Sequence, residues 1–245
     1  MDFSIRSQLL SINHAFYEQF ASSFSATRHQ VQPGVRKLAQ QLMLDADSVL
    51  DVGCGNGTLA RALIQNGFSG AYLGMDMSEG LLSQAKHMTG NPTQGHFAFQ
   101  PVDLSAENWI NALPQSSYDW LTCFAVLHHI PGASYRQQLV MDFVKLTAIK
   151  SRIAISVWQW QNSPRLRKRV VPWSTVGLNP DDLEAGDVLL DWRAGETPGL
   201  RYVHTFDDQE LAQLAEGAGL RVTESFYSDG KQGNLALYQV WEKPN

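Results

Sequence analysis

The feature of this 245-residue chain that most constrains its fold is a glycine-rich segment at residues 51–57, with the sequence DVGCGNG. The apolar residues Val49 and Leu50 precede it, and a helical pattern follows over residues 58–64. Strand, glycine-rich turn and helix in this order are typical of a nucleotide-type cofactor site in an α/β sheet. Glycines let the backbone approach a ligand closely, and the free N–H groups of the following helix point at that ligand.

The spacing of the glycines indicates the kind of cofactor. They follow the pattern Gly-x-Gly-x-Gly, whereas the dinucleotide fingerprint is Gly-x-Gly-x-x-Gly. Asp51 stands just before the first glycine, where a carboxylate would repel a pyrophosphate but would suit a ligand with an ammonium group. Residues 72–76 then read as a second strand that ends in Asp76, an acid that can accept hydrogen bonds from ribose hydroxyls. S-adenosylmethionine carries an ammonium and a ribose diol and has no phosphate.

These elements together resemble motif I and the following acidic position of the class I S-adenosylmethionine-dependent methyltransferases. The resemblance implies a Rossmann-like α/β fold, a three-layer sandwich whose sheet is mostly parallel with an antiparallel last strand. It also implies S-adenosylmethionine as cofactor, S-adenosylhomocysteine as product, and no metal. The cofactor-binding residues implied are Arg28, Asp51, Gly53, Cys54, Gly55, Asn56, Gly57, Asp76, Met77, Asp103, Leu104, Phe124 and Ala125.

The resemblance gives some of these residues a specific role. Asp103 would take the adenine amino group, and Leu104 would offer its backbone N–H to the ring. Phe124 and Ala125 would touch the cofactor. Arg28 would pair with the methionine carboxylate, because guanidinium groups bind carboxylates well. The alternatives are that Arg28 is a solvated arginine and that Asp103 is an ordinary surface aspartate.

Composition predicts a globular cytoplasmic protein. Hydrophobic residues make up 44% of the chain and charged residues 18%, as expected for a sizeable core. The two cysteines, Cys54 and Cys123, lie in a glycine turn and an apolar strand, which favours buried thiols in a reducing compartment. We expect no signal peptide and no membrane association, because the N-terminus is acidic and no apolar run approaches ~20 residues. The net charge of −5 argues against a nucleic-acid binder that uses its whole surface, but not against a local basic patch.

The chain reads as a single domain over residues 1–245, in which four segments are distinguished. We expect an N-terminal helical lid at 1–45, a cofactor-binding core at 46–160, an insertion over the active edge at 161–204, and a C-terminal helix and strand hairpin at 205–245. The strands are predicted at residues 48–52, 71–76, 97–102, 118–124, 153–159, 220–227 and 235–241.

Three further stretches resemble one branch of the family, the tRNA wobble-uridine carboxymethyl methyltransferases, which esterify a 5-carboxymethyl group on a uridine. They are residues 16–21 together with 24–28, residues 186–192, and residues 201–206 with the sequence RYVHTF followed by 210–211. A basic cluster at residues 165–169 would either contact phosphates or form a solvated helix face. If the substrate is RNA, we expect a continuous basic surface from this cluster to Arg201. Eukaryotic members of the branch work with a small activator subunit, which is therefore a possible partner.

The chemical nature of the methyl acceptor determines which side chains the reaction needs. A carboxylate acceptor is already an anion and needs no base, so the enzyme must position it and neutralise its charge. Arg201 and His204 are the candidates for that task, helped by Tyr17; an amine or hydroxyl acceptor would instead need a base such as His128. The alternatives are structural: a packed histidine in the 128–129 loop, and a strand-edge cluster around Arg201 and His204. No residue is assigned as catalytic.

Three functions remain open on this basis. The first is methylation of a modified tRNA uridine, the second is O- or N-methylation of a small molecule, and the third is a non-catalytic cofactor-binding scaffold for a partner chain. An enclosed apolar pocket would favour the second.

Overall fold

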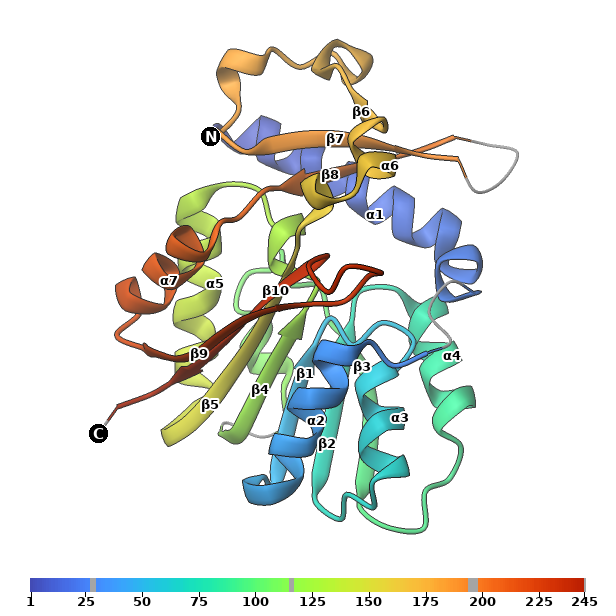
Figure 1. Cartoon of the computed structure of the whole chain (residues 1–245), viewed down its shortest axis with the longest axis vertical. Helices are drawn as coiled ribbons and strands as arrows, with labels where there is room; N and C mark the ends of the chain where they lie inside the picture. Colours follow the sequence, from blue (N-terminus) through green and yellow to red (C-terminus); the bar gives the residue numbers. More distant parts are fainter. Residues whose placement is uncertain (27–29, 115–116, 194–197, 245) are drawn as a thin grey trace.

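The computed structural model describes residues 1–26, 30–114, 117–193 and 198–244, and a seven-stranded sheet forms its centre (Figure 1). The strand order is β3-β2-β1-β4-β5-β10-β9. Neighbouring strands are parallel except that β10 runs antiparallel to both β5 and β9. This arrangement confirms the predicted sheet. The strands are β1 Ser48–Val52, β2 Ala71–Asp76, β3 His96–Pro101, β4 Tyr118–Phe124, β5 Thr147–Trp158, β9 Arg221–Ser228 and β10 Ala236–Glu242.

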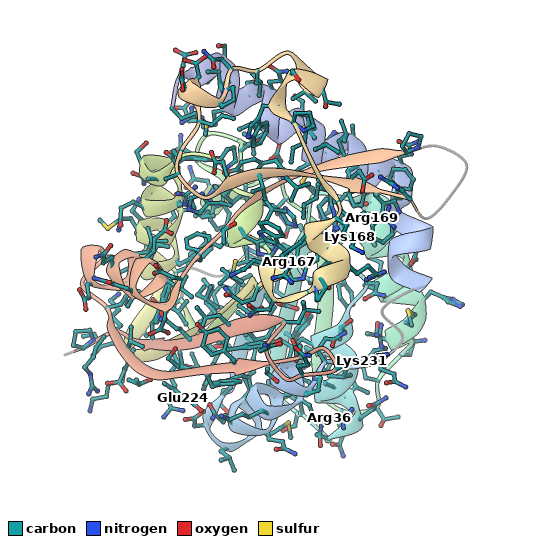
Figure 2. All side chains as sticks on the ribbon, turned by 45° about the horizontal axis from the view of Figure 1, so that its top comes forward. Arg36, Arg167, Lys168, Arg169, Glu224 and Lys231 are labelled. Carbon is teal, nitrogen blue, oxygen red and sulfur yellow. The ribbon has the colours of Figure 1, made fainter. Side chains whose placement is uncertain are left out.

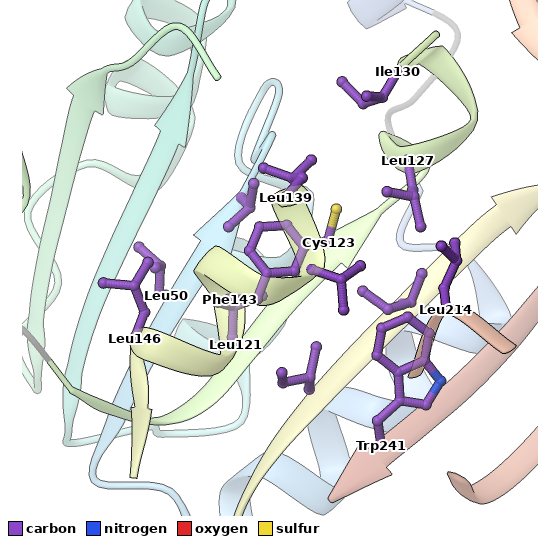
Figure 3. Packing of buried hydrophobic residues seen from close by; sticks show 14 of the residues in the cluster. Leu50, Leu121, Cys123, Leu127, Ile130, Leu139, Phe143, Leu146, Leu214 and Trp241 are labelled. Carbon is purple, nitrogen blue, oxygen red and sulfur yellow. The ribbon is translucent and has the colours of Figure 1, made fainter. Parts of the chain in front are cut away.

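Helices cover both faces of this sheet and give the three predicted layers (Figure 1). On one face α2 and α3 bury Leu38, Leu42 and Leu59 against the sheet. On the other face α5 and α7 pack on it, and Figure 3 shows Phe143 of α5 beside Leu121 of β4. The helices are α2 Pro33–Asp45, α3 Thr58–Gln65, α4 Glu79–Thr89, α5 Ala133–Lys145 and α7 Asp208–Gly217.

Local sequence sets where two of these helices begin. Ser78 caps α4, because its Oγ accepts a hydrogen bond from the N–H of Leu81 at 3.3 Å. Asp207 caps α7 by accepting from the N–H of Glu210 at 2.7 Å. The carboxylate of Glu210, however, bonds to His204 instead of completing a reciprocal capping box.

A second, three-stranded antiparallel sheet occupies the predicted insertion, where no sheet was predicted. Its strands are β6 Val170–Val171, β7 Asp187–Trp192 and β8 Gly199–His204. Helix α1, Phe3–Ala26, lies between this sheet and the end of the large sheet where β1 and β4 finish (Figure 1). Short helical segments connect the rest: η1 Trp109–Ala112, η2 Leu127–His129, η3 Trp160–Asn162, α6 Pro164–Arg167, η4 Trp173–Val176 and η5 Pro180–Asp182.

The hydrophobic pattern of the helices gives no sign of a membrane span. Within the described ranges, none of them combines the length and the apolar character that crossing a bilayer requires. Cys54 and Cys123 are both free and buried, as predicted.

Candidate active site

The glycine-rich loop between β1 and α3 has the backbone that its sequence predicts. Gly53, Gly55 and Gly57 all have positive φ, at 70°, 55° and 76°. A Cβ at Gly53 would lie 2.2 Å from Val126, whereas a Cβ at Gly55 would meet no atom within 4 Å. The loop is therefore packed against Val126 at Gly53, and there is free space beside Gly55. A ligand can approach the backbone at Gly55, so the loop fits the expected cofactor.

Asp51 is buried beneath this loop. Its Oδ2 accepts a hydrogen bond from the hydroxyl of Tyr72 at 2.6 Å, and its Oδ1 accepts from Thr122 at 2.7 Å. Burial raises the pKa of Asp51 to about 6, although the two hydrogen bonds lower it, and the nearby charge of Asp76 raises it further. A carboxylate in this environment gains from a cationic partner, which agrees with the proposed contact to an ammonium group.

Asp76 at the end of β2 connects the two halves of the expected site. Its Oδ2 accepts from the N–H of Gly55 at 2.9 Å, and its Oδ1 accepts from the N–H of Ser78 at 3.0 Å. Burial raises the pKa of Asp76, against hydrogen bonds from Ser78, Gly55 and Met77 that lower it. The carboxylate thereby holds the glycine loop against β2.

The remaining residues of the loop have contacts within the protein. Cys54 donates its N–H to the carbonyl of Met75 at 2.9 Å, and burial raises the pKa of its thiol well above the ordinary value. The Oδ1 of Asn56 accepts from the hydroxyl of Thr58 at 2.9 Å, which orders the start of α3. These contacts define the shape of the loop from within the protein.

The residues expected around the adenine lie at the ends of β3 and β4. Asp103 is exposed and accepts from the N–H of Ser105 at 2.8 Å. The carbonyl of Leu104 accepts from the hydroxyl of Tyr135 at 2.7 Å. Phe124 packs edge-to-face on Tyr238, and Ala125 has a φ of 58°, an unusual value for a residue with a Cβ. The strained turn at Ala125 ends β4 beside the glycine loop, whose Gly53 faces Val126.

The loop after β4 places two histidines under α1. The Nδ1 of His129 lies 2.9 Å from the carbonyl of Tyr202, so this nitrogen donates, and the Nε2 accepts from the hydroxyl of Tyr17 at 2.8 Å. The Nδ1 of His128 accepts from the N–H of Trp158 at 3.2 Å. The structure therefore brings Tyr17 to His129, a pairing that the sequence did not predict.

Arg201 of β8 lies in a cage of aromatic rings, which we call the Arg201 cage and which consists of Phe16, Trp158 and Trp192. The guanidinium carbon lies 4.7, 4.9 and 5.2 Å from their respective ring centroids. Only 5% of Arg201 is exposed, so its charge is weakly screened by water. Trp158 also lies next to His128, so the cage adjoins the histidine loop. The sequence singled out Arg201 but not the rings that enclose it.

His204 does not share this environment. Because successive side chains of β8 point to opposite faces, His204 lies on the same face as Tyr202. Both side chains bond to the Oδ1 of Asp187 at 2.7 Å. The Nε2 of His204 lies 2.8 Å from Glu210. Burial lowers the pKa of His204, but the hydrogen bonds that its ring makes to the carboxylates of Asp187 and Glu210 outweigh it and the net shift is upward. The His204 ring thus links β8 to Asp187 and to Glu210 of α7, and we do not group it with Arg201.

Ligand atoms of Glu184, Asp187 and His204 lie within 4.8 Å of one another, a spacing that a cation could use. The guanidinium of Arg136, however, already donates to Glu184 at 2.9 Å and lies 3.2 Å from the Nε2 of His204. The positive charge of this cluster comes from the protein, so the geometry gives no reason to place a metal there.

One predicted residue, Arg28, lies outside the described residues, and one residue that was not predicted contacts the histidine loop. Asn13 of α1, to which the sequence gave no role, is buried and connects three backbone groups: its Nδ2 donates to the carbonyls of His129 and Tyr202, both at 3.2 Å, and its Oδ1 accepts from the N–H of Tyr202 at 2.9 Å. The signal available in the sequence was an asparagine at helical spacing from Leu9 and Phe16, on the apolar face of an amphipathic helix.

Comparison with known proteins agrees with this geometry. The family model described as a methyltransferase domain matches residues 24–225. The tRNA (carboxymethyluridine(34)-5-O)-methyltransferase of Schizosaccharomyces pombe is 26% identical over 228 residues, which cover 87% of this chain and 90% of that protein. The ubiquinone biosynthesis O-methyltransferase of Coxiella burnetii is 31% identical over 105 residues, or 42% of each chain.

Solved structures share the fold. An S-adenosylmethionine-dependent methyltransferase from Clostridium acetobutylicum superposes with a TM-score of 0.67 at 12% identity, over 95% of this chain and 99% of that one. A chain from the complex between the Haloferax volcanii Trm112 methyltransferase activator and a methyltransferase gives 0.64 at 15% identity, over 94% and 97%. The match to the family model covers most of the sequence, and the sheet order and glycine loop agree with it. This chain belongs to the methyltransferase domain family and is a class I enzyme that uses S-adenosylmethionine.

Proposed function

We propose that this enzyme transfers the methyl group of S-adenosylmethionine to the carboxylate of a 5-carboxymethyluridine in tRNA. The observation that carries the proposal is the Arg201 cage. A buried guanidinium between aromatic rings is a cation held away from water, next to the loop of His128 and His129. Such a cation is suited to an anionic acceptor, because its attraction to a carboxylate is stronger there than in water.

Methyl transfer to a carboxylate asks for positioning rather than for proton removal. S-adenosylmethionine supplies an electrophilic methyl group, and the acceptor is already an anion. We assign Asp51, Asp76 and the glycine loop to the cofactor, and Arg201 to orienting the acceptor and balancing its charge. Tyr17 and His129, paired at 2.8 Å, would form the wall of the site on the side of α1. Holding the reacting groups in line contributes several kcal/mol to the rate enhancement.

The comparisons favour RNA over a small molecule as the source of that carboxylate. The tRNA-modifying relative aligns along 87% of this chain, including the second sheet, whereas the ubiquinone-pathway relative aligns along only 42%. A match of the second kind is what a shared cofactor core alone would give. Small-molecule O- or N-methylation therefore remains the alternative outcome of the test.

The test is transfer of labelled methyl groups into total tRNA and, in parallel, into an RNA-free small-molecule extract. Each assay is run with and without an added activator of the kind bound in the archaeal complex. We expect label in tRNA, released by mild alkali as expected for a methyl ester. Label confined to the small-molecule extract would refute the tRNA assignment.

The matched variants are Arg201→Gln and Arg152→Gln. Arg152 also lies over a tryptophan, 5.2 Å from the ring of Trp120, but its side chain is 37% exposed and pairs with Asp45. We expect Arg201→Gln to lower kcat/KM for tRNA by about 100-fold or more, as for loss of a buried charged partner worth ~3 kcal/mol, with cofactor affinity unchanged. Equal activity of the two variants would remove Arg201 from the proposal.

A further inference from the structure

Basic side chains gather on one side of the molecule although the chain as a whole is acidic, with a net charge of −5. Figure 2 labels Arg167 and Lys168 at the end of α6, Lys231 between β9 and β10, and Arg36 of α2, all on the same side. All four side chains are exposed, and no carboxylate in the described part of the chain forms an ion pair with them. We call these four residues the basic face. Arg169, labelled nearby, is instead bonded to Asp191 at 3.4 Å.

This basic face differs from the surface that the sequence predicted for an RNA enzyme. The expected surface joined residues 165–169 to Arg201, but Arg201 is only 5% exposed and lies in its aromatic cage. The cations continue instead toward Lys231 and Arg36 (Figure 2). The segment just before α6 is bonded to the connection between β9 and β10, where Asn162 of η3 donates to the carbonyl of Asn234 at 2.8 Å.

An open hollow of about 580 Å³ is lined in part by residues just before α6 and by part of the connection between β9 and β10. We call it the polar hollow; its lining includes Gln159, Gln161, Asn162, Asp207, Tyr227 and Asn234. Asn162 lies two residues before the start of α6, and Asn234 lies three residues after Lys231, so the hollow is bordered by the two segments that carry the basic residues. Gln159 of its lining directly follows Trp158 of the Arg201 cage in the sequence.

The chemistry of the lining suits a nucleobase. Tyr227 is 50% exposed and offers a ring face, while the amides and Asp207 offer hydrogen-bonding groups to a base edge. Gln161 donates from its Nε2 to Gln159 at 2.9 Å, but its Oε1 is buried and has no hydrogen-bond partner within the described ranges of the chain. A buried acceptor in this state is stabilised by any ligand that brings a donor.

We infer that the polar hollow binds an unstacked nucleotide of the RNA substrate while the basic face binds the neighbouring phosphates. The inference rests on the proposed function, because it assumes that the acceptor is RNA. The nucleotide in the hollow lies next to the one whose base carries the methyl acceptor. The basic face supplies affinity without sequence preference, and Tyr227 supplies stacking that a duplex cannot use.

The inference is tested by fluorescence anisotropy of the cofactor-free protein with two labelled RNAs, a hairpin with a single-stranded loop and a blunt duplex of the same stem. Tyr227→Ala should weaken hairpin binding by about 5- to 100-fold, the range of base-stacking contributions, and leave duplex binding unchanged. Tyr227→Phe keeps the ring and should bind both RNAs as the unaltered protein does. Equal hairpin affinity for Tyr227→Ala and the unaltered protein would overturn the assignment of the hollow.

The basic face is tested with the triple variant Arg167→Gln, Lys168→Gln, Lys231→Gln. Its control removes three charges from other elements, with Lys86→Gln, Lys145→Gln and Arg221→Gln on α4, α5 and β9. The first variant should weaken binding of both RNAs and reduce the slope of log K against log salt by about 2, whereas the control should not. Equal effects of the two variants would overturn the basic face. So would loss of binding to anionic vesicles with RNA affinity unchanged, because that result identifies a membrane surface.

These measurements separate this inference from the proposed function. RNA binding without methyl transfer to tRNA would refute the proposed function and leave the basic face and the hollow in place. Methyl transfer to tRNA that is unaffected by Tyr227→Ala and by the triple variant would refute only the inference.

Discussion

At the scale of single residues, Asp51 is the group through which we expect cofactor binding to depend on pH. Its carboxylate is buried, its two oxygens accept hydrogen bonds from Tyr72 and Thr122, and burial raises its pKa to about 6. A cationic group of the cofactor needs the ionised form. Cofactor binding and proton release at Asp51 are therefore linked.

This linkage predicts that the affinity for S-adenosylhomocysteine falls as the pH is lowered. With a pKa of about 6, Asp51 is mostly ionised at pH 7 and mostly protonated at pH 5, so the apparent Kd should rise by about tenfold over that interval. Isothermal titration calorimetry at several pH values measures it. A Kd that is equal at pH 5 and pH 7 would contradict the assignment of Asp51 to the ammonium group.

The same pKa predicts the opposite effect on the free protein. The folded-state pKa lies above the ordinary 3.8, so folding favours the protonated form, and this contribution is lost as the pH rises through about 6. Asp51→Asn cannot ionise and should raise the free energy of unfolding by up to about 3 kcal/mol at pH 7.5 and by about half of that at pH 5, because the difference builds up between the two pKa values. Urea unfolding of the cofactor-free protein at both pH values checks this. A variant that is less stable at pH 7.5 would show that the lost hydrogen-bond geometry outweighs the charge.

The residues that the sequence identified most directly belong to one continuous segment. The positive φ values of Gly53, Gly55 and Gly57 could be predicted because spacing alone defines the turn. The Arg201 cage could not, because Phe16, Trp158 and Trp192 come from α1, β5 and β7, and only the fold brings them together. His204 was grouped with Arg201 because the two are close in sequence, but strand alternation separates them.

At the scale of elements, the strands of the large sheet were predictable because each is a short apolar run ending at a turn or an acid. Most predicted boundaries fall within one residue of the observed ones, but β5 begins at Thr147, six residues before its predicted start at 153. The second sheet was missed because its strands bury polar residues. Asp187, Arg201 and His204 interrupt the apolar alternation in β7 and β8, so periodicity alone does not identify them as strands.

Those buried polar residues attach the second sheet to the helices that cover the large sheet. Arg136 of α5 is 1% exposed and bonds to Glu184 at 2.9 Å, while His204 bonds to Glu210 of α7 at 2.8 Å. Arg136 also donates to the carbonyl of Ile130 at 3.1 Å. The attachment therefore includes a buried charged cluster beside the apolar contacts of Trp160 with Leu190 and Val203, and we expect it to be sensitive to the loss of a charged member.

Removing Arg136 should accordingly be costly. Arg136→Met leaves Glu184, Asp187 and Glu210 with one cation fewer, and we expect it to lower the free energy of unfolding by about 3–5 kcal/mol. The control is Arg221→Met, whose 67% exposed side chain pairs with Glu242; its effect should be within about 0.5 kcal/mol. Thermal and urea denaturation measure both. Equal destabilisation would mean that the cluster does not hold the second sheet in place.

At the scale of the whole molecule, α1 is the component shared by both sheets. It lies between them (Figure 1), with Phe16 packed on Trp192 of the small sheet and Tyr17 bonded to His129 beside the large one. The position of α1 therefore depends on side chains from both sheets. The role of residues 1–45 as a lid stays a prediction, and it requires that α1 can separate from the sheets without unfolding them.

Asn13 is the residue through which this can be tested. Asn13→Ala would leave the carbonyl of His129 with one donor fewer and the N–H of Tyr202 without its acceptor, both in a buried environment. We expect faster hydrogen exchange in α1 and β8, with protection of β1, β4 and β5 unchanged. The cost should be about 1–3 kcal/mol for each unsatisfied group.

Ser11→Ala on the same helix is the matched control, because the exposed Ser11 hydroxyl bonds only to the carbonyl of Ser7 among the described contacts. Its exchange pattern should match that of the unaltered protein. If Asn13→Ala increases exchange in α1 and β8 but not in the large sheet, and the cofactor still protects α1 when added, α1 moves as a lid over a fixed site. If exchange increases equally throughout the large sheet, α1 is part of the folded core, and the lid interpretation of residues 1–45 is wrong.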